Sequence, residues 1–250
     1  MDLGLIGQKA LVTGGSAGIG AATARVLARE GVHVVIAARS DDRLQAVAQS
    51  IKEELPGARV SSEICDVSES AQIDALAQRH PDLDILVNNA GAVPSGGLLE
   101  VDEPRWREGW DSKVFAYINA ARSFYRLMKT RGSGVIINIS GAGARMKRAD
   151  YLCAGMANAA IDFFTETLGA AAPADGIRVI GISPGPVGTE RYRKIASQRL
   201  SAGEPPRRYP FGRVAEPEEI GELIAFCVSK RCSYVSGAVI MIDGGISVAR

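Results

Sequence analysis

Metal-binding and redox-active side chains are scarce in this sequence of 250 residues, which contains two histidines and four cysteines. The cysteines form no C-x-x-C pair, and His33 and His80 lie in unrelated segments. Metal ions and disulfide frameworks need such residues in clusters or pairs at short spacings. The sequence therefore predicts no metal site. It predicts buried, reduced thiols at Cys65, Cys153, Cys227 and Cys232.

Two further absences narrow the range of partners. The 29 basic and 28 acidic residues nearly cancel, so no overall field attracts nucleic acid or an anionic membrane. No apolar run approaches the roughly 18 residues that a membrane-spanning helix needs. The N-terminal segment carries Asp2 where a secretory signal would carry bases. We therefore expect a cytoplasmic protein that binds neither nucleic acid nor a membrane.

The overall amino-acid composition is that of one globular domain. Hydrophobic residues make up 46% of the chain and charged residues 23%, enough for a core between three layers. Apolar segments of strand length alternate with helical segments, which predicts a single α/β domain over residues 1–250. The expected strands cover residues 10–12, 32–38, 59–64, 83–87, 134–140, 177–182 and 239–242, and the longer expected helices 19–30, 41–55, 104–130, 151–172 and 216–228.

A glycine-rich turn follows the first expected strand. Gly14, Gly18 and Gly20 lack the Cβ atoms that would keep a ligand away from the backbone. The first turn of the next helix presents unpaired N–H groups and a positive dipole end, so this turn is a candidate pyrophosphate site. A tight turn before any helix is the alternative. A P-loop is excluded, because Gly20 is not followed by Lys and then Ser or Thr.

Four motifs resemble those of the short-chain dehydrogenases/reductases and occur in the same order. They are Thr13-Gly-x-x-x-Gly18-x-Gly20, Asn88-Asn89-Ala90-Gly91, the I-I-N-I-S segment that ends at Ser140, and Pro184-Gly185-x-Val187-x-Thr189. The resemblance extends from about residue 5 to about residue 247. It implies a Rossmann-type doubly wound sheet of seven mainly parallel strands in the order 3-2-1-4-5-6-7, with helices on both faces. It also implies a homo-oligomer, either a tetramer or a dimer.

The same resemblance implies which residues bind a nicotinamide dinucleotide. The glycine turn would hold the pyrophosphate, Asp66 and Val67 the adenine ring, and the segment that ends at Thr189 the carboxamide. The implied residues are Gly14, Ser16, Gly18, Ile19, Gly20, Arg39, Asp66, Val67, Asn88, Ala90, Gly91, Pro184, Gly185, Val187 and Thr189. Asp66 would also suit the cap of a helix that begins near Ser68.

Arg39, directly after the second strand, bears on the choice of cofactor. In this fold a carboxylate at the end of that strand accepts hydrogen bonds from the ribose of NAD, whereas an arginine accommodates the 2′-phosphate of NADP. The sequence has Ala38 followed by Arg39, with no carboxylate. We therefore expect NADP(H) to be preferred over NAD(H). The alternative is a solvated arginine, because Ala17 stands where NADP-dependent members often carry a second base.

The catalytic positions depart from the family's set of Ser, Tyr, Lys and Asn. Alignment of the helix over residues 151–172 puts Asn158 at the lysine position and Ala154 at the tyrosine position. The serine position falls on Gly141, and the asparagine position falls on Lys113. All four usual positions are therefore changed.

The four residue types nevertheless occur close by. Ser140 precedes the serine position, and Tyr151 lies about one helical turn before the tyrosine position. Lys113 and Asn158 have exchanged helices. Hydride transfer to a carbonyl develops negative charge on oxygen, which needs a proton donor and a hydrogen-bonding partner. Tyr151 is the candidate donor, and Lys113 is the cation that would lower its pKa. In the alternative, Tyr151 only packs at a helix start and Lys113 lies on the surface.

These features predict an NAD(P)(H)-dependent oxidoreductase that transfers a hydride between nicotinamide and a carbonyl or alcohol. Two alternatives stay open. The spacing of Tyr151 and Asn158 resembles the Y-x6-K arrangement of enoyl reductases, which reduce an activated C=C bond. Loss of all four usual positions would also fit a catalytically silent dinucleotide-binding subunit or sensor.

The segment 190–212 is polar and corresponds to the family's substrate lid. Its basic residues are Arg191, Arg193, Lys194, Arg199, Arg207 and Arg208. This charge suits a small-molecule substrate that is acidic or is a thioester. A solvated helix face is the alternative explanation.

Overall fold

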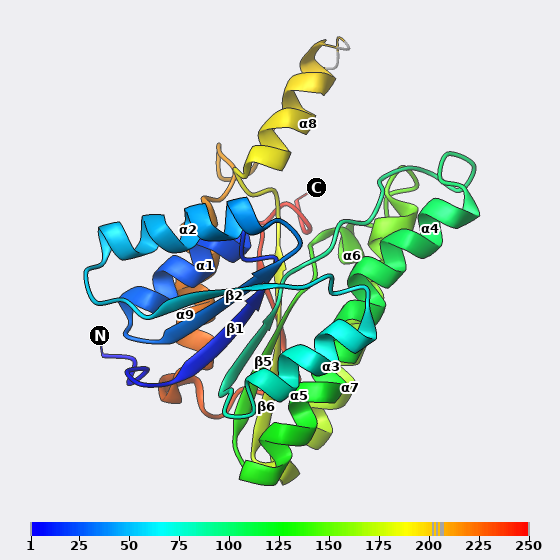
Figure 1. Cartoon of the computed structure of the whole chain (residues 1–250). Coiled ribbons are helices and arrows are strands. Elements are labelled where there is room, and N and C mark those ends of the chain that lie inside the picture. Colours follow the sequence, from blue (N-terminus) through cyan, green and yellow to red (C-terminus); the bar gives the residue numbers. More distant parts are fainter. Residues whose placement is uncertain (1, 202, 204, 206–207, 250) are drawn as a thin grey trace.

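A parallel sheet of seven strands forms the centre of the computed structural model, which describes residues 2–201, 203, 205 and 208–249 (Figure 1). The strand order is β3-β2-β1-β4-β5-β6-β7, and all neighbouring strands run parallel. The strands are β1 (Lys9–Thr13), β2 (His33–Ala38), β3 (Val60–Ile64), β4 (Ile85–Asn88), β5 (Gly134–Ile139), β6 (Ile177–Pro184) and β7 (Val239–Ile242). The doubly wound order predicted from the sequence is confirmed.

Helices cover both faces of this sheet (Figure 1). The α-helices are α1 (Gly18–Arg29), α2 (Asp41–Glu54), α3 (Ser70–Arg79), α4 (Glu103–Trp110), α5 (Ala116–Arg131), α6 (Gly143–Met146), α7 (Leu152–Ala171), α8 (Glu190–Ser201) and α9 (Pro217–Val228). Short 3-10 turns are η2 (Ala172–Asp175) and η3 (Lys230–Cys232). Helices α1, α2 and α9 pack on one face, and α3 and α5 pack on the other.

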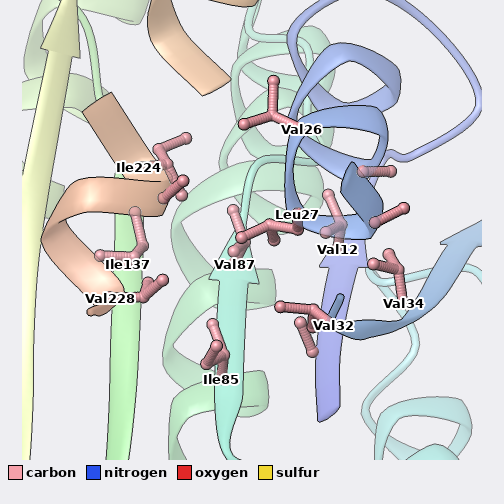
Figure 2. Packing of buried hydrophobic residues seen from close by; sticks show 14 of the residues in the cluster. Val12, Val26, Leu27, Val32, Val34, Ile85, Val87, Ile137, Ile224 and Val228 are labelled. Atoms are coloured by element: carbon pink, nitrogen blue, oxygen red, sulfur yellow. The ribbon is translucent and has the colours of Figure 1, made fainter. Parts of the chain in front are cut away.

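Burial on both faces explains why the strands appear in the sequence as continuous apolar runs. Successive residues of a strand point to opposite faces. Val12 therefore packs under α1 and α9, whereas Leu11 packs under α3 and α5. Figure 2 shows the first of these interfaces, where Val12 and Val87 lie close to Leu27 of α1, and Ile137 faces Ile224 of α9.

One expected element takes a different form. The sequence predicts a single helix over residues 104–130, but the structure contains α4, a π turn over Asp111–Phe115 (η1) and α5. The chain stays helical on both sides, because the flanking residues Trp110 and Ala116 keep right-handed helical angles. A π turn shifts the backbone hydrogen bonds by one residue, and such turns are frequent at functional sites. Lys113 lies at its centre.

The carboxyl ends of the strands meet at one edge of the sheet. Neighbours β1 and β4 lie where the strand order reverses, and they end at Thr13 and Asn88. Ligands of doubly wound sheets bind in the crevice at this point. Strands β5 and β6 end on the same edge, at Ile139 and Pro184. The expected cofactor and catalytic residues therefore converge there.

Helix α8 covers the first part of the expected lid and projects away from the sheet and its covering helices (Figure 1). None of its described residues is buried. Arg207 of the expected lid lies outside the described residues. Within the described ranges, every helix lacks the combination of length and hydrophobicity that crossing a bilayer requires.

Candidate active site

The glycine turn between β1 and α1 forms a cradle made of backbone. Gly14 (φ +67°) and Gly18 (φ +55°) adopt the left-handed conformation that favours glycine. A Cβ at Gly20 would collide with the carbonyl oxygen of Gly14. The first turn of α1 holds no acidic residue, and its N-cap residue Ala17 makes no side-chain hydrogen bond. The N–H groups of this turn therefore face an open cradle that fits a pyrophosphate.

Thr13 and Asn89 hold the cradle against the end of β4. The Thr13 hydroxyl accepts hydrogen bonds from the N–H groups of Asn89 (3.0 Å) and Ala90 (3.1 Å). The Asn89 amide donates in return to the carbonyls of Thr13 (2.9 Å) and Gly14 (3.3 Å). Sequence reasoning gave these two residues no role, although both stand inside the motifs on which it relied.

Asn88 points away from the cradle and into the protein. Its side chain is 1% exposed and donates to Asn138 Oδ1 on β5 at 2.9 Å. The Asn138 amide donates to the hydroxyl of Thr165 on α7 at 3.0 Å. The Thr165 hydroxyl donates to the carbonyl of Ile161 at 2.7 Å. Asn88 therefore links β4 to β5, which Ser140 directly follows, and to α7, which carries Asn158.

Arg39 and Asp66 lie side by side after β2 and β3. The Arg39 side chain is 81% exposed, and its Nη1 lies 4.0 Å from Asp66 Oδ2. Asp66 accepts hydrogen bonds from the N–H (3.0 Å) and the hydroxyl (2.7 Å) of Ser68. Burial acts to raise the pKa of Asp66, but Ser68 and Arg39 outweigh it, and the pKa is lowered. Asp66 does not cap α3, because the N-cap residue is Glu69.

The loop after β6 forms the expected nicotinamide end of the site. The Pro184 carbonyl accepts a hydrogen bond from the N–H of Ala142 at 2.8 Å. A Cβ at Gly185 would lie 2.8 Å from the Cα of Asp243, closer than real Cβ atoms approach. Only glycine therefore lets this loop pass so close to the chain that follows β7.

Thr189 joins this loop to the glycine cradle and to α8. A Cβ at Gly18 would lie 3.1 Å from Thr189 Cγ2, so the cradle and the loop are in close contact. The Thr189 hydroxyl accepts the N–H of Tyr192 at 3.2 Å, which fixes the first turn of α8. Val187 pairs with Ala215 in an isolated bridge. The remaining expected cofactor residues are partly or fully exposed: Ser16, Ile19, Val67, Ala90 and Gly91.

Lys113 reaches from the π turn to β5 and α7. Its ammonium donates to the Ser140 carbonyl at 3.1 Å and to Asn158 Oδ1 at 2.9 Å. The π turn approaches the end of the Asn88–Gly91 motif closely, because a Cβ at Gly91 would lie 2.7 Å from Lys113 Cβ. The structure therefore brings the exchanged residues Lys113 and Asn158 into direct contact.

The environment of Lys113 changes its acidity. Burial is the largest cause, and together with the positive charge of Arg191 it lowers the pKa of Lys113 to about 8, against the opposing charge of Asp162. The ordinary value is about 10.4. Groups that donate or accept protons in catalysis work best with pKa values near the working pH. Lys113 is half-buried, and its ammonium points inward to Ser140 and Asn158, so it is not a solvated surface lysine.

Tyr151 is fixed at the entrance of α7, where it is the N-cap residue. It forms an isolated bridge with Gly96, and a Cβ at Gly143 would collide with its ring. The ring packs on the same apolar cluster as Val114 of the π turn. Tyr151 and Lys113 therefore lie on elements that pack together.

Ala154 and Gly141 stand where the sequence analysis expects the family's tyrosine and serine. Ala154 is 3% exposed. A Cβ at Gly141 would lie 3.0 Å from Asn158 Nδ2, so the Asn158 amide lies against the serine position. Asn158 itself is 3% exposed. The amide therefore lies between Lys113 and the backbone that would otherwise carry the serine.

Ser140 contacts Lys113 through its backbone carbonyl and not through its hydroxyl. Its carbonyl accepts the Lys113 ammonium, whereas its hydroxyl oxygen is buried and has no hydrogen-bond partner among the described residues. The hydroxyl lies close enough to Asp162 to lower the pKa of that carboxyl, although burial keeps the pKa raised overall. The hydroxyl predicted to serve as a donor therefore faces α7.

Comparison with known proteins shows the family to which this chain belongs. A family model described as enoyl-(acyl carrier protein) reductase matches residues 14–247. Over 242 residues the chain is 35% identical to the cis-4-hydroxycyclohexanecarboxylate dehydrogenase of Sinomonas cyclohexanicum, which covers 94% of this chain and 95% of that protein. The chain belongs to the short-chain dehydrogenase/reductase family. As a member of this family it is an oxidoreductase that transfers a hydride between a nicotinamide cofactor and a carbonyl or alcohol.

Two solved structures of short-chain dehydrogenases/reductases have the same fold. One is the L-sorbose reductase of Gluconobacter frateurii in complex with NADPH and L-sorbose, with a TM-score of 0.89 and 31% identity over 100% of both chains. The other is an NADPH-bound short chain oxidoreductase of Pseudomonas aeruginosa PAO1 that contains an atypical catalytic center. Its TM-score is 0.87 and its identity 28%, over 97% of this chain and 98% of that chain.

Lys113→Met tests the environment of Lys113 without any ligand. The folded protein releases the Lys113 proton near pH 8, whereas the unfolded chain keeps it up to about pH 10. The unfolded state then binds more protons between these values, so stability rises with pH across this window. We expect the unfolding free energy of the wild type to rise relative to that of Lys113→Met between about pH 8 and pH 10 in urea titrations. If the difference in unfolding free energy between the wild type and Lys113→Met stays constant with pH, the lowered pKa of Lys113 is contradicted.

Proposed function

We propose that this protein reduces a carbonyl group, and oxidises the corresponding alcohol, with a catalytic set in which lysine and asparagine have exchanged places. The observation that carries the proposal is the pair of hydrogen bonds from the Lys113 ammonium to Asn158 Oδ1 and the Ser140 carbonyl. The lysine thus lies beside the amide that replaces it on α7. These contacts support an active enzyme over a silent dinucleotide-binding subunit, which has no need of a desolvated cation at this point.

Each residue of the set has a distinct task. When bound, the nicotinamide supplies the hydride in reduction and accepts it in oxidation. Tyr151 donates its hydroxyl proton to the oxygen on which negative charge develops, and its phenolate takes the proton back in the reverse direction. The Lys113 ammonium stabilises that phenolate and the developing oxyanion. Asn158 and the Ser140 carbonyl hold the ammonium in place.

The cofactor proposal is NADP(H) in preference to NAD(H). The glycine cradle, whose first-turn N–H groups have no side-chain cap, fits a pyrophosphate. Arg39 follows β2, is largely exposed, and has Asp66 as its ion-pair neighbour at the limit of 4.0 Å. Its guanidinium is therefore free to turn toward a 2′-phosphate. The related structures that contain NADPH support the same choice.

The substrate proposal is a small molecule with an acidic group. Arg191, in the first turn of α8, is exposed, and its charge acts on Lys113 across the site. Two cations that face one site favour an anion between them. The dehydrogenase of Sinomonas cyclohexanicum is named for a carboxylate substrate. Segment 190–212 would then serve as the lid that brings Arg191 to the substrate, and a thioester is the other substrate class that its basic residues suit.

The assembly and location expected from the sequence remain proposals. Large apolar side chains on η1 and α7 are exposed: Phe115 (51%), Met156 (47%) and Phe163 (70%). Exposed apolar groups on η1 and α7 support a homo-oligomer, either a tetramer or a dimer. We also propose a cytoplasmic location, on the sequence grounds given above.

Lys113→Met and Tyr151→Phe each remove one proposed catalytic group. We expect each to lower kcat/KM by roughly 10²-fold or more, the usual cost of losing a proton-transfer group. The assay follows nicotinamide absorbance with a panel of ketones and enones. Lys52→Met and Tyr234→Phe are the matched controls, because both side chains are exposed and lie far along the chain from Lys113 and Tyr151. Near wild-type rates for both site variants would refute the exchanged set, and turnover of enones alone would show a C=C reductase.

Arg39→Ala tests the cofactor proposal. A charge-assisted hydrogen bond contributes about 1.5 to 3 kcal/mol, so NADPH affinity should fall by about one to two decades while NADH affinity changes little. Fluorescence titration of both cofactors measures the two constants. Arg105→Ala on α4, another exposed arginine, is the control. Equal affinity of the wild type for NADPH and NADH would remove the proposal.

Arg191→Ala tests the substrate proposal. The assay pairs each keto acid of the panel with its methyl ester. We expect KM for the keto acids to rise by about tenfold, in line with the loss of one hydrogen bond to a charged group, and KM for the esters to stay unchanged. Arg193→Ala, an exposed arginine on the same helix, is the matched control. An equal effect of Arg191→Ala on acids and esters would contradict an anion site.

A further inference from the structure

The Lys113 ammonium lies among groups that do not balance its charge. Its two hydrogen-bond acceptors, the Ser140 carbonyl and Asn158 Oδ1, are neutral. Arg191 on α8 repels it. A desolvated cation is costly unless an opposite charge lies near it. The exchanged arrangement therefore needs an anion that the usual residues of the family do not supply.

Asp162 is placed to be that anion. It lies on α7 one helical turn after Asn158, so both side chains project from the same face of the helix. Among the described residues that act electrostatically on Lys113, Asp162 is the anion. In turn, burial raises the pKa of the Asp162 carboxyl; Ser140, Arg145 and Lys113 act to lower it, and Glu166 acts to raise it.

Two buried polar atoms, one of Ser140 and one of Asp162, are a second observation at this point of the structure. Within the described part of the chain, Asp162 Oδ1 and the Ser140 hydroxyl oxygen are both buried without a hydrogen-bond partner. Leaving such atoms unpaired destabilises the folded protein, so their retention needs a reason other than stability. The Ser140 carbonyl accepts a hydrogen bond from Lys113, and the Ser140 side chain acts to lower the pKa of Asp162. Ser140 thus interacts with both charged residues.

We propose that the Asp162 carboxylate is the counter-charge of the Lys113 ammonium and that the Ser140 hydroxyl positions this carboxylate. Asp162 is a positioning residue, because it acts through Lys113 and not on the substrate. The proposal rests on the proposed function only for its effect on turnover. Its physical content is that the charge of Asp162 sets the pH at which Lys113 loses its proton.

Asp162→Asn removes the charge and keeps the volume of the side chain. The pKa of Lys113 should then fall by about one unit, the lower end of what a nearby opposite charge contributes. The rise of unfolding free energy with pH, taken relative to the same protein with Lys113→Met, should begin about one pH unit lower than in the wild type. The loss of turnover at high pH should move down by the same amount. Neither readout responds to a merely structural role.

Two control variants complete the experiment. Asp162→Glu keeps the charge and should restore the wild-type pH dependence. Glu166→Gln removes the exposed carboxylate one turn further along α7 and should leave both pH midpoints where they are. The proposal is overturned if the unfolding free energy rises over the same pH range in the wild type, Asp162→Asn and Glu166→Gln.

The stability measurement needs neither cofactor nor substrate, so it separates this proposal from the proposed function. The protein could reduce no carbonyl, while Asp162→Asn shifts the pH range over which the unfolding free energy rises. That result would support the counter-charge and refute the enzyme mechanism. If turnover depends on Lys113 but Asp162→Asn leaves this pH range unchanged, the mechanism is supported and the counter-charge is refuted.

Discussion

The close approach of two backbone segments at the reversal of the strand order underlies the rest of the site. The glycine turn after β1 lies against the end of β4, so near that the Asn89 amide reaches the carbonyls of both Thr13 and Gly14. A side chain at Gly14 would lie 2.9 Å from the Cα of Ala90. The same contact orients α1 toward the crevice, and Gly91 then lets the π turn approach the end of β4. The glycine cradle and Lys113 are thus both positioned by this one junction.

The fold could be predicted because its determinants are local in the sequence. A strand covered on both faces must be apolar at successive positions, as at Leu11 and Val12, and it must end at a turn. The order of the strands came from the motifs, since glycine turns and strand-end asparagines occur at fixed places in this architecture. The crossovers are right-handed in nearly all parallel sheets, which removes most other topologies.

The residues of the candidate site stay predictions from the sequence, and the structure adds the geometry that the sequence could not give. Lys113 and Asn158 were identified from their positions, but the π turn that brings them together has the same residue pattern as an α-helix, and only hydrogen bonds distinguish the two. The orientation of Ser140 was available from the sequence, because it alternates with Asn138 on a strand and so shares that residue's face. Asp162 was also visible one turn after Asn158, but a lone carboxylate on a helix is ordinarily solvated, and nothing in the sequence marks its burial.

Helix α8 carries Arg191 on an element that contributes no buried side chain. Contacts of its first turn include the Thr189 hydroxyl, which accepts the N–H of Tyr192, the Thr189 carbonyl, which accepts the N–H of Arg193, and the hydroxyl contact between Tyr192 and Tyr209. Opening such a helix exposes almost no apolar surface, so it unfolds locally at little free-energy cost while the sheet stays intact. The backbone amides of α8 should therefore exchange with deuterium long before those of α5 and α7. The segment that carries Arg191 is thus thermodynamically separate from η1 and α7, which carry Lys113 and Asn158.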